Sequence, residues 1–234
     1  MSREGDVKIS ALGDPGPERR TQLTRARVME AAIELADRDG LESISMRKLA
    51  QELGVEAMSL YTHVRNKKDL LDGMTDAVLG QIPTAVDGAG WKASLRQLVL
   101  AARGVMLRHP WAPGAVQQQS TPGPAALTYV DTVLGILREG GFSVAQTHHA
   151  LHLLGSRLLG FTQDVFDDSG DLAPEAVAGL VRQLGASHPY VVEMAVAVTH
   201  DGALGGCDDG AEFAFTLDFI LDGLSRLQGG PAES

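Results

Sequence analysis

The sequence predicts an all-α protein built from two helical domains. Apolar residues recur every three or four positions over most of the chain, which is the period of an amphipathic helix. Residues that favour helix starts precede several of these stretches, and segments rich in Pro and Gly separate them. Because no alternating pattern typical of a strand persists, we expect helices throughout.

The composition limits what kind of protein this chain can be. It has 234 residues, of which 44% are hydrophobic and 21% are charged, so it can bury a core and is not mostly disordered. The 20 Lys and Arg against 30 Asp and Glu give a net charge of −10. Residues 1–70 hold 12 basic and 12 acidic side chains, so the rest of the chain carries the whole negative charge.

Features of secreted and membrane proteins are missing from the sequence. A single cysteine excludes an internal disulfide framework. The first ten residues lack an apolar signal core, and no stretch approaches the roughly 20 apolar residues of a membrane span. We therefore expect a cytoplasmic protein with no membrane partner.

The N-terminal domain is expected at residues 21–80, after a flexible arm at residues 1–20 that is rich in Gly, Pro and charge. Its first helix starts at Thr21 or Thr24, either of which can cap a helix, and ends at Gly40. Two short helices and a tight turn are expected next, and a fourth helix follows them. These three helices are expected to start at Ser45, near Glu56 and at Asn66.

The second domain is expected at residues 91–229 and is larger. Pro83, Gly88 and Gly90 make residues 82–90 the expected linker. Further helices are expected at residues 91–108, 124–140, 143–166, 175–200 with a break at 187–189, and 209–228.

The spacing in residues 46–65 is typical of a helix-turn-helix. Such a motif needs a small residue where its helices cross, a glycine that can adopt a left-handed turn, and apolar anchors on either side. Ala50, Gly54, Val55 and Leu60 have these offsets. The second helix would then direct its outer residues at the major groove of DNA. An ordinary three-helix bundle with solvated charges remains the alternative.

The run GLESISMRKLAQELGVEAMSLYTHVRNKKDLLDGM resembles the DNA-binding domain of the TetR family of transcriptional regulators. The later stretches RHPWAPG, GGFSVAQTHHALHLLGSRLLGF and EFAFTLDFILDGL are similar to the regulatory domain of that family. The resemblance implies a homodimer that binds a near-palindromic operator in double-stranded DNA. It also implies that repression lasts until a small-molecule effector binds the second domain.

The resemblance also implies roles for individual residues. Tyr61 and Lys67 would hold DNA phosphates, and Thr24, Ser45 and Arg47 would add backbone or groove-edge contacts. The residues that would face the bases are Ala57, Met58, Ser59, Thr62 and His63. The tetracycline repressors carry Gln, Pro and Trp at positions 57, 58 and 62, so base selection here is expected to depend on Ser59, Met58, Arg47 and DNA shape.

Two helices of the second domain are expected to form the dimer interface. Their apolar seams comprise Leu151, Leu154, Leu158 and Phe161 on one helix and Phe213, Leu217, Ile220 and Leu224 on the other. Two such helices from each subunit would form a four-helix interface. The alternative is that both helices are buried in the core of a monomer.

An effector pocket is expected among residues that mix apolar surface with polar groups. The candidates are Trp111, Phe142, His149, His152, Ser156, Gln163 and Phe166. By resemblance to the tetracycline repressors, His109 and Asp164 would hold a magnesium-linked ligand, and no other cofactor or metal is expected. For each aromatic residue, core packing is the alternative.

Two other functions remain open. The same fold could serve as a DNA-binding module with no small-molecule effector. A small helical enzyme could use the cluster of His148, His149 and His152, although no nucleophile and base pair or complete metal set accompanies it. No catalytic residue is therefore expected, and the helix at 67–80 is expected to link effector binding to DNA binding.

Overall fold

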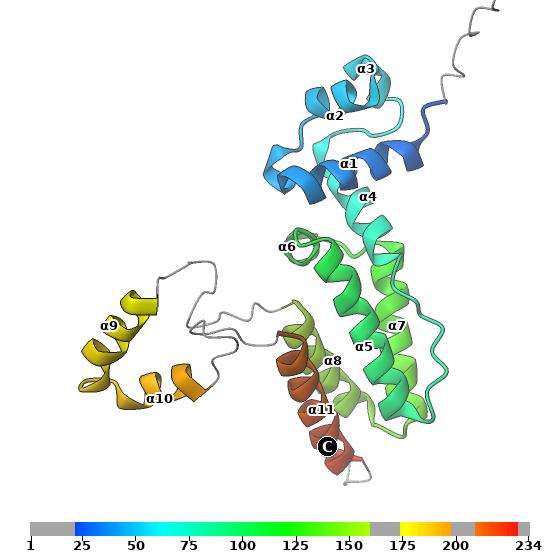
Figure 1. Cartoon of the computed structure of the whole chain (residues 1–234). Helices are drawn as coiled ribbons and strands as arrows, with labels where there is room; N and C mark the ends of the chain where they lie inside the picture. The colour runs from blue at the N-terminus through cyan, green and yellow to red at the C-terminus, as the bar shows by residue number, and fades with distance from the viewer. Residues whose placement is uncertain (1–21, 160–173, 198–208, 229–234) are drawn as a thin grey trace, which may run out of the picture.

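The protein is described by a computed structural model that covers residues 22–159, 174–197 and 209–228. Within these ranges the chain forms helices and no strand, as predicted (Figure 1). The first elements are α1 (Arg25–Asp39), the 3-10 helix η1 (Leu41–Ser43), α2 (Met46–Leu53), α3 (Ala57–Leu60) and α4 (Lys67–Leu79). The later ones are α5 (Trp91–Arg108), α6 (Ala112–Gln118), α7 (Pro124–Glu139), α8 (Val144–Leu159), α9 (Pro174–Gly185), α10 (Pro189–Ala197) and α11 (Asp209–Leu227).

Side-chain caps define the helix starts of the N-terminal half. Thr24, Ser45 and Asn66 each accept a hydrogen bond from the backbone N–H three residues later, at 3.2, 3.2 and 2.9 Å. Gly54 ends α2 in the left-handed conformation, with φ 64° and ψ 34°. The predicted caps and the predicted turn glycine are therefore confirmed.

The structure differs from the predicted elements in two places. Helix α3 is a single turn, followed by turn residues up to Val64 rather than by more helix. Helix α6 was not predicted, because Pro113 and Gly114 suggested a loop. Pro113 lies in the first turn of α6, where a helix needs no N–H from that residue. The predicted arm at 1–20 and the end of the helix predicted at 143–166 lie outside the described residues.

Helix α4 contributes to two hydrophobic cores, one near its start and one near its end. Leu70 and Met74 of α4 belong to the core formed with α1, α2 and α3. Val78 and Leu79, one turn further on, belong to the core of the second half. Trp111 packs against both cores. Helix α4 is therefore shared by the two halves, and residues 82–90 connect it to α5.

The second half is a bundle of α5, α7, α8 and α11, in which α5 and α8 each contact the other three helices (Figure 1). Helix α6 contacts α4 at one end of this bundle. An ion pair between Arg96 and Asp218, at 2.7 Å, joins α5 to α11 on the surface. Within the described part of the chain, no helix is both long and apolar enough to cross a membrane.

Candidate nucleic-acid interface and cavity

The outer side of α3 and the turn after it form an exposed surface, which we call the reading face. Its members are Ala57, Met58, Ser59, Tyr61, Thr62 and His63. Met58 is 75% exposed and Tyr61 is 46% exposed, while Leu60 and Val64 behind them are buried. Ala57, Ser59 and His63 are half-buried and Thr62 is exposed. The predicted inward and outward residues of this segment are thus found on the expected sides.

Backbone hydrogen bonds keep the reading face compact beyond the end of α3. The N–H groups of Tyr61, Thr62 and His63 donate to carbonyls three residues earlier, at 3.2, 3.4 and 2.9 Å. The Thr62 hydroxyl donates to the carbonyl of Ser59 at 2.7 Å. These bonds continue a helical turn up to Val64, so the exposed side chains project from an ordered backbone.

The predicted phosphate contacts surround the reading face. Thr24 and Ser45 use their hydroxyl oxygens as cap acceptors, which leaves each hydroxyl proton for another acceptor. Lys48 pairs with Asp39 at 2.8 Å, and Lys68 pairs with Asp72 at 2.6 Å. Among the described residues, Arg47 and Lys67 have no ion-pair partner and are exposed, so their charges are available to an anion.

Asp69 fixes the end of the reading face to two helices. Its carboxylate accepts hydrogen bonds from Arg25 of α1 at 3.0 Å and from the backbone N–H of Arg65 at 2.8 Å. Arg25 also donates to the carbonyl of His63 at 2.5 Å. The Arg25 guanidinium, helped by the Arg65 N–H, holds the pKa of Asp69 well below its ordinary range. Asp69 is therefore ionised at neutral pH and joins α1, α4 and the reading face.

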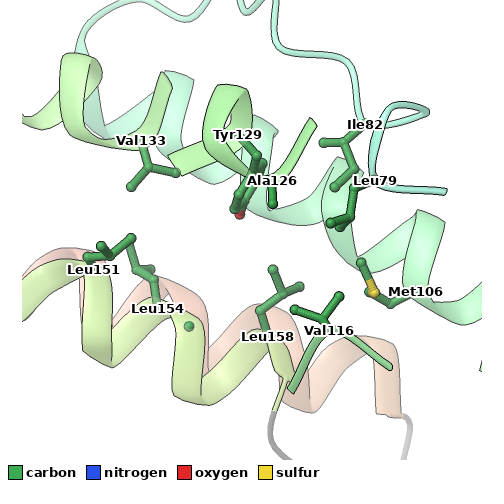
Figure 2. A pocket seen from close by; sticks show the side chains of 11 residues that line it. Leu79, Ile82, Met106, Val116, Ala126, Tyr129, Val133, Leu151, Leu154 and Leu158 are labelled. Carbon is green, nitrogen blue, oxygen red and sulfur yellow. The ribbon is translucent and has the colours of Figure 1, made fainter. Parts of the chain in front are cut away.

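An apolar cavity lies in the second half, between α7 on one side and α8 on the other (Figure 2). Its free volume is about 90 Å³. It is lined by Leu79, Ile82, Met106, Val116, Ala126, Tyr129, Val133, Leu151, Leu154, Gly155 and Leu158. Tyr129 carries the one polar side-chain group among these lining residues, and burial raises its pKa to about 12. The cavity thus suits apolar matter and a neutral phenol.

The predicted pocket residues do not line this cavity. Phe142 is buried in the core, where its ring meets the edge of Trp91 at 4.8 Å. His149, His152 and Ser156 are exposed on α8. Gln163, Asp164 and Phe166 lie outside the described residues. On α8 the leucines, rather than the histidines, face this cavity.

His109 lies at the junction of the two halves rather than in the cavity. Its Nδ1 is 2.9 and 3.0 Å from the two carboxylate oxygens of Asp37 in α1, and its Nε2 is 3.3 Å from Gln81 Oε1. Trp111 donates from Nε1 to the same carboxylate at 2.7 Å. The predicted pocket residues His109 and Trp111 therefore tie the corner between α5 and α6 to α1.

The residues predicted for the dimer interface lie inside the subunit. Leu154, Phe213, Leu217 and Leu224 are buried, and the other three described members pack against the same core, namely Leu151, Leu158 and Ile220. Phe161 lies outside the described residues. Both helices have two apolar sides, and periodicity does not say which one faces inward. Outward apolar residues of these helices include Leu153, Phe215 and Phe219.

Sequence reasoning missed two acidic residues that join the halves. Asp37 of α1 binds His109 and Trp111. Asp76 of α4 accepts a hydrogen bond from the backbone N–H of Ala125, in the first turn of α7, at 2.8 Å. Gly123 precedes α7 and has no side chain that could cap the helix. This missing cap is the one signal in the sequence that the first N–H groups of α7 need an acceptor from elsewhere in the chain.

A paired-helix reading face, joined through a shared helix to a bundle with an internal apolar cavity, defines a DNA-binding regulator with a sensory domain. The family model described as "Bacterial regulatory proteins, tetR family" matches residues 28–74. The model described as "Tetracyclin repressor-like, C-terminal domain" matches residues 83–227. The chain therefore belongs to the TetR family of transcriptional regulators.

Relatives support this assignment over nearly the whole chain. The transcriptional repressor DrrR1 of Streptomyces coeruleorubidus is 32% identical, covering 97% of this chain and 88% of its own. A transcriptional regulator of Saccharopolyspora erythraea is 37% identical, covering 92% of this chain and 91% of its own. The structure of the Streptomyces coelicolor protein ActR bound to (S)-DNPA is 25% identical with a TM-score of 0.68, covering 89% of this chain and all of ActR.

Replacing Asp69 by Asn is expected to lower the free energy of unfolding by about 1–3 kcal/mol near neutral pH, because charge-assisted hydrogen bonds are lost. Arg25 and Arg65 lower the folded-state pKa, so this contribution is fully present above the unfolded pKa of about 3.9. It is lost as pH falls towards the folded pKa. Urea unfolding can be followed by circular dichroism from about pH 6 to about pH 3. The difference in free energy of unfolding between wild type and D69N should become smaller as the pH falls.

Asp72→Asn is the matched control for this experiment, because Asp72 lies on the same helix and pairs only with the exposed Lys68. Its effect is expected to stay below about 1 kcal/mol. A gap between wild type and D69N that stayed constant over the whole pH range would contradict the role assigned to the ionised carboxylate.

Proposed function

We propose that this regulator is a homodimeric repressor that leaves its operator when an uncharged, largely apolar small molecule fills the cavity. The observation that carries the proposal is the position of α4. Leu79 at the end of α4 lines the cavity, while Leu70 and Met74 of the same helix support the reading face from behind. A change in the cavity therefore acts directly on a helix of the DNA-binding half.

The exposed cations and hydroxyls around the reading face support its contact with operator DNA. Lys67 would neutralise a phosphate at the start of α4, and the half-exposed Tyr61 would donate a hydrogen bond to another. Thr24, Ser45 and Arg47 would bind further backbone positions. Met58, which is exposed, would contact thymine methyl groups, with Ala57, Ser59, Thr62 and His63 around it. Because the proposed partner is operator DNA, we expect the protein to act in the cytoplasm.

Replacing Lys67 by Ala is expected to weaken binding to DNA from upstream of the gene and to make it less sensitive to salt. Each lost phosphate contact should reduce the slope of log affinity against log salt by about 0.9. Fluorescence anisotropy at several salt concentrations measures both effects. Lys92→Ala is the control, because Lys92 is paired with Asp222 on the surface of the second half. An unchanged slope for K67A would refute the phosphate role.

The size of the cavity supports a response to a ligand. At about 90 Å³ it is smaller than typical ligand pockets, which measure about 300–1,000 Å³. A ligand that fills it must move the walls apart, and these walls include the end of α4, α6 and the first half of α7. The apolar lining favours an uncharged ligand, because a buried charge would lack a partner among the described residues of the wall.

The magnesium-linked ligand that the resemblance implies would need His109, which lies at the junction of the two halves. Both ring nitrogens of His109 have protein partners, Asp37 and Gln81, and the ring does not line the cavity. Among the described residues, no group of three or more His, Cys, Asp or Glu side chains could hold a metal ion. Asp164 lies outside the described residues. The magnesium-linked ligand at His109 therefore stays a prediction, and the proposed effector site is the apolar cavity.

A pair of Trp variants tests the cavity with N-phenyl-1-naphthylamine, an uncharged aromatic probe whose fluorescence rises in apolar surroundings. Ala126→Trp fills the cavity and is expected to weaken probe binding by about tenfold or more, equivalent to about 1.4 kcal/mol. Leu127→Trp, at the exposed neighbouring position, is expected to leave binding unchanged. The titration is done in EDTA. Binding that required magnesium, or equal binding by both variants, would contradict the proposed site.

Exposed apolar side chains support the homodimer. Phe219 is 73% exposed and Phe215 is 70% exposed on α11, and Leu153 is exposed on α8, which contacts α11. Exposing several large apolar side chains to water is unfavourable. A second copy of the same face would cover them in a symmetric four-helix contact. The partner-facing side is thus opposite to the one predicted from the sequence.

Replacing Phe219 by Asp is expected to convert the dimer into monomers, because the contact would bury an unpaired carboxylate. Sedimentation velocity gives the mass directly. Leu107→Asp is the control, since Leu107 is also exposed but lies on α5. A dimeric F219D protein, or a monomeric wild type, would refute the proposed interface.

The exposure of the histidine cluster favours regulation over catalysis. His148 and His152 stack edge to face at 4.6 Å, and both are exposed on α8 rather than placed around a cavity. A catalytic histidine needs a second group within hydrogen-bond reach and a site that excludes water. The described surroundings of these rings provide neither arrangement.

A further inference from the structure

We propose that Asp76 couples the cavity to the reading face by capping α7 from a helix of the DNA-binding half. This inference rests on the proposed response to a ligand and assigns the residue that transmits it. In this role Asp76 is a positioning residue, because it touches neither the ligand nor DNA.

The start of α7 lacks the cap that a helix normally has. Gly123 has no side chain, and Pro124 at the first helical position has no N–H, so Ala125 presents the first free donor of the helix. Asp76 Oδ1 accepts that hydrogen bond at 2.8 Å. A carboxylate at this end is also attracted to the positive end of the helix dipole, and this attraction strengthens the contact.

The close approach of the two helices depends on Gly123. A methyl group at that position would overlap the Asp76 carboxylate, with the carboxylate carbon at 3.0 Å and Asp76 Cβ at 3.3 Å. The backbone of Gly123, with φ −76° and ψ 170°, is accessible to any residue. The glycine is therefore needed to make room for Asp76 rather than for its backbone conformation.

The hydrogen bond joins two walls of the cavity. Ala126, next to Ala125, lines the cavity from α7, and Leu79, one turn after Asp76, lines it from α4. A ligand that pushes the start of α7 outward therefore pulls on α4 through Asp76. Helix α4 also holds Asp69 and Met74, which support the reading face, so the displacement is passed to DNA binding.

The experiment measures the coupling factor, which is the ratio of the DNA dissociation constants with and without saturating N-phenyl-1-naphthylamine. The DNA is the fragment from upstream of the gene, and the full-length protein is used. Coupling factors in allosteric proteins are about 5–150. For wild type we expect a factor in this range. For Asp76→Ala we expect a factor below about 2, with the affinities of the free protein for probe and for DNA each within about twofold of wild type.

Three further variants separate coupling from a general loss of stability. Asp76→Asn keeps an acceptor oxygen and is expected to retain most of the coupling. Gly123→Ala displaces the carboxylate and is expected to lose it. Gly135→Ala on the same helix is the matched control, because nothing lies within 4 Å of a methyl group there, and its coupling should equal that of wild type.

Each outcome decides a separate statement. A wild-type factor of at least about 5 that persists in both D76A and G123A would overturn the role of Asp76 and leave the proposed function standing. A wild-type factor of one despite probe binding would overturn the proposed ligand response, and the role of Asp76 with it. Loss of coupling in D76A and G123A, with retention in D76N and G135A, would support the inference.

Discussion

The packing of α4 in two hydrophobic cores is the constraint on which the rest of the structure depends. Leu70 and Met74 belong to the core behind the reading face, whereas Val78 and Leu79 belong to the core of the bundle. A helix resists bending because its backbone hydrogen bonds run along its whole length. The two halves therefore cannot move independently of α4, and a change in either core alters the position of the whole helix.

Polar contacts fix the positions of the helices that this apolar packing holds together. Asp69 joins the first turn of α4 to α1 and to the end of the reading face, and Asp76 joins the same helix to α7. Asp37 joins α1 to the corner between α5 and α6 through His109 and Trp111. Apolar packing permits sliding, whereas a carboxylate with fixed donors defines a position. Asp37 and Asp76 thus specify how the two halves sit against each other, and Asp69 fixes the reading face within its own half.

Local features of the sequence were sufficient to predict most of the helices, α6 excepted, but not which apolar side of α8 and α11 faces inward. Caps such as Thr24 and the left-handed Gly54 act within a few residues, so the N-terminal half could be predicted nearly completely. The choice between the two apolar sides of α8 depends on what the bundle places beside it. Likewise His109 turns towards Asp37, which is 72 residues away, and no local pattern contains that information.

The small cavity explains how a ligand could favour one state of the protein over another. A ligand shifts an equilibrium only by the difference between its affinities for the two states. A cavity of about 90 Å³ cannot accept a larger molecule without expanding, so such a molecule binds the expanded state better. In the proposed mechanism, DNA binds the state in which α4 holds the reading face in register with the groove. The two ligands then compete through the position of α4, although their sites share no residue.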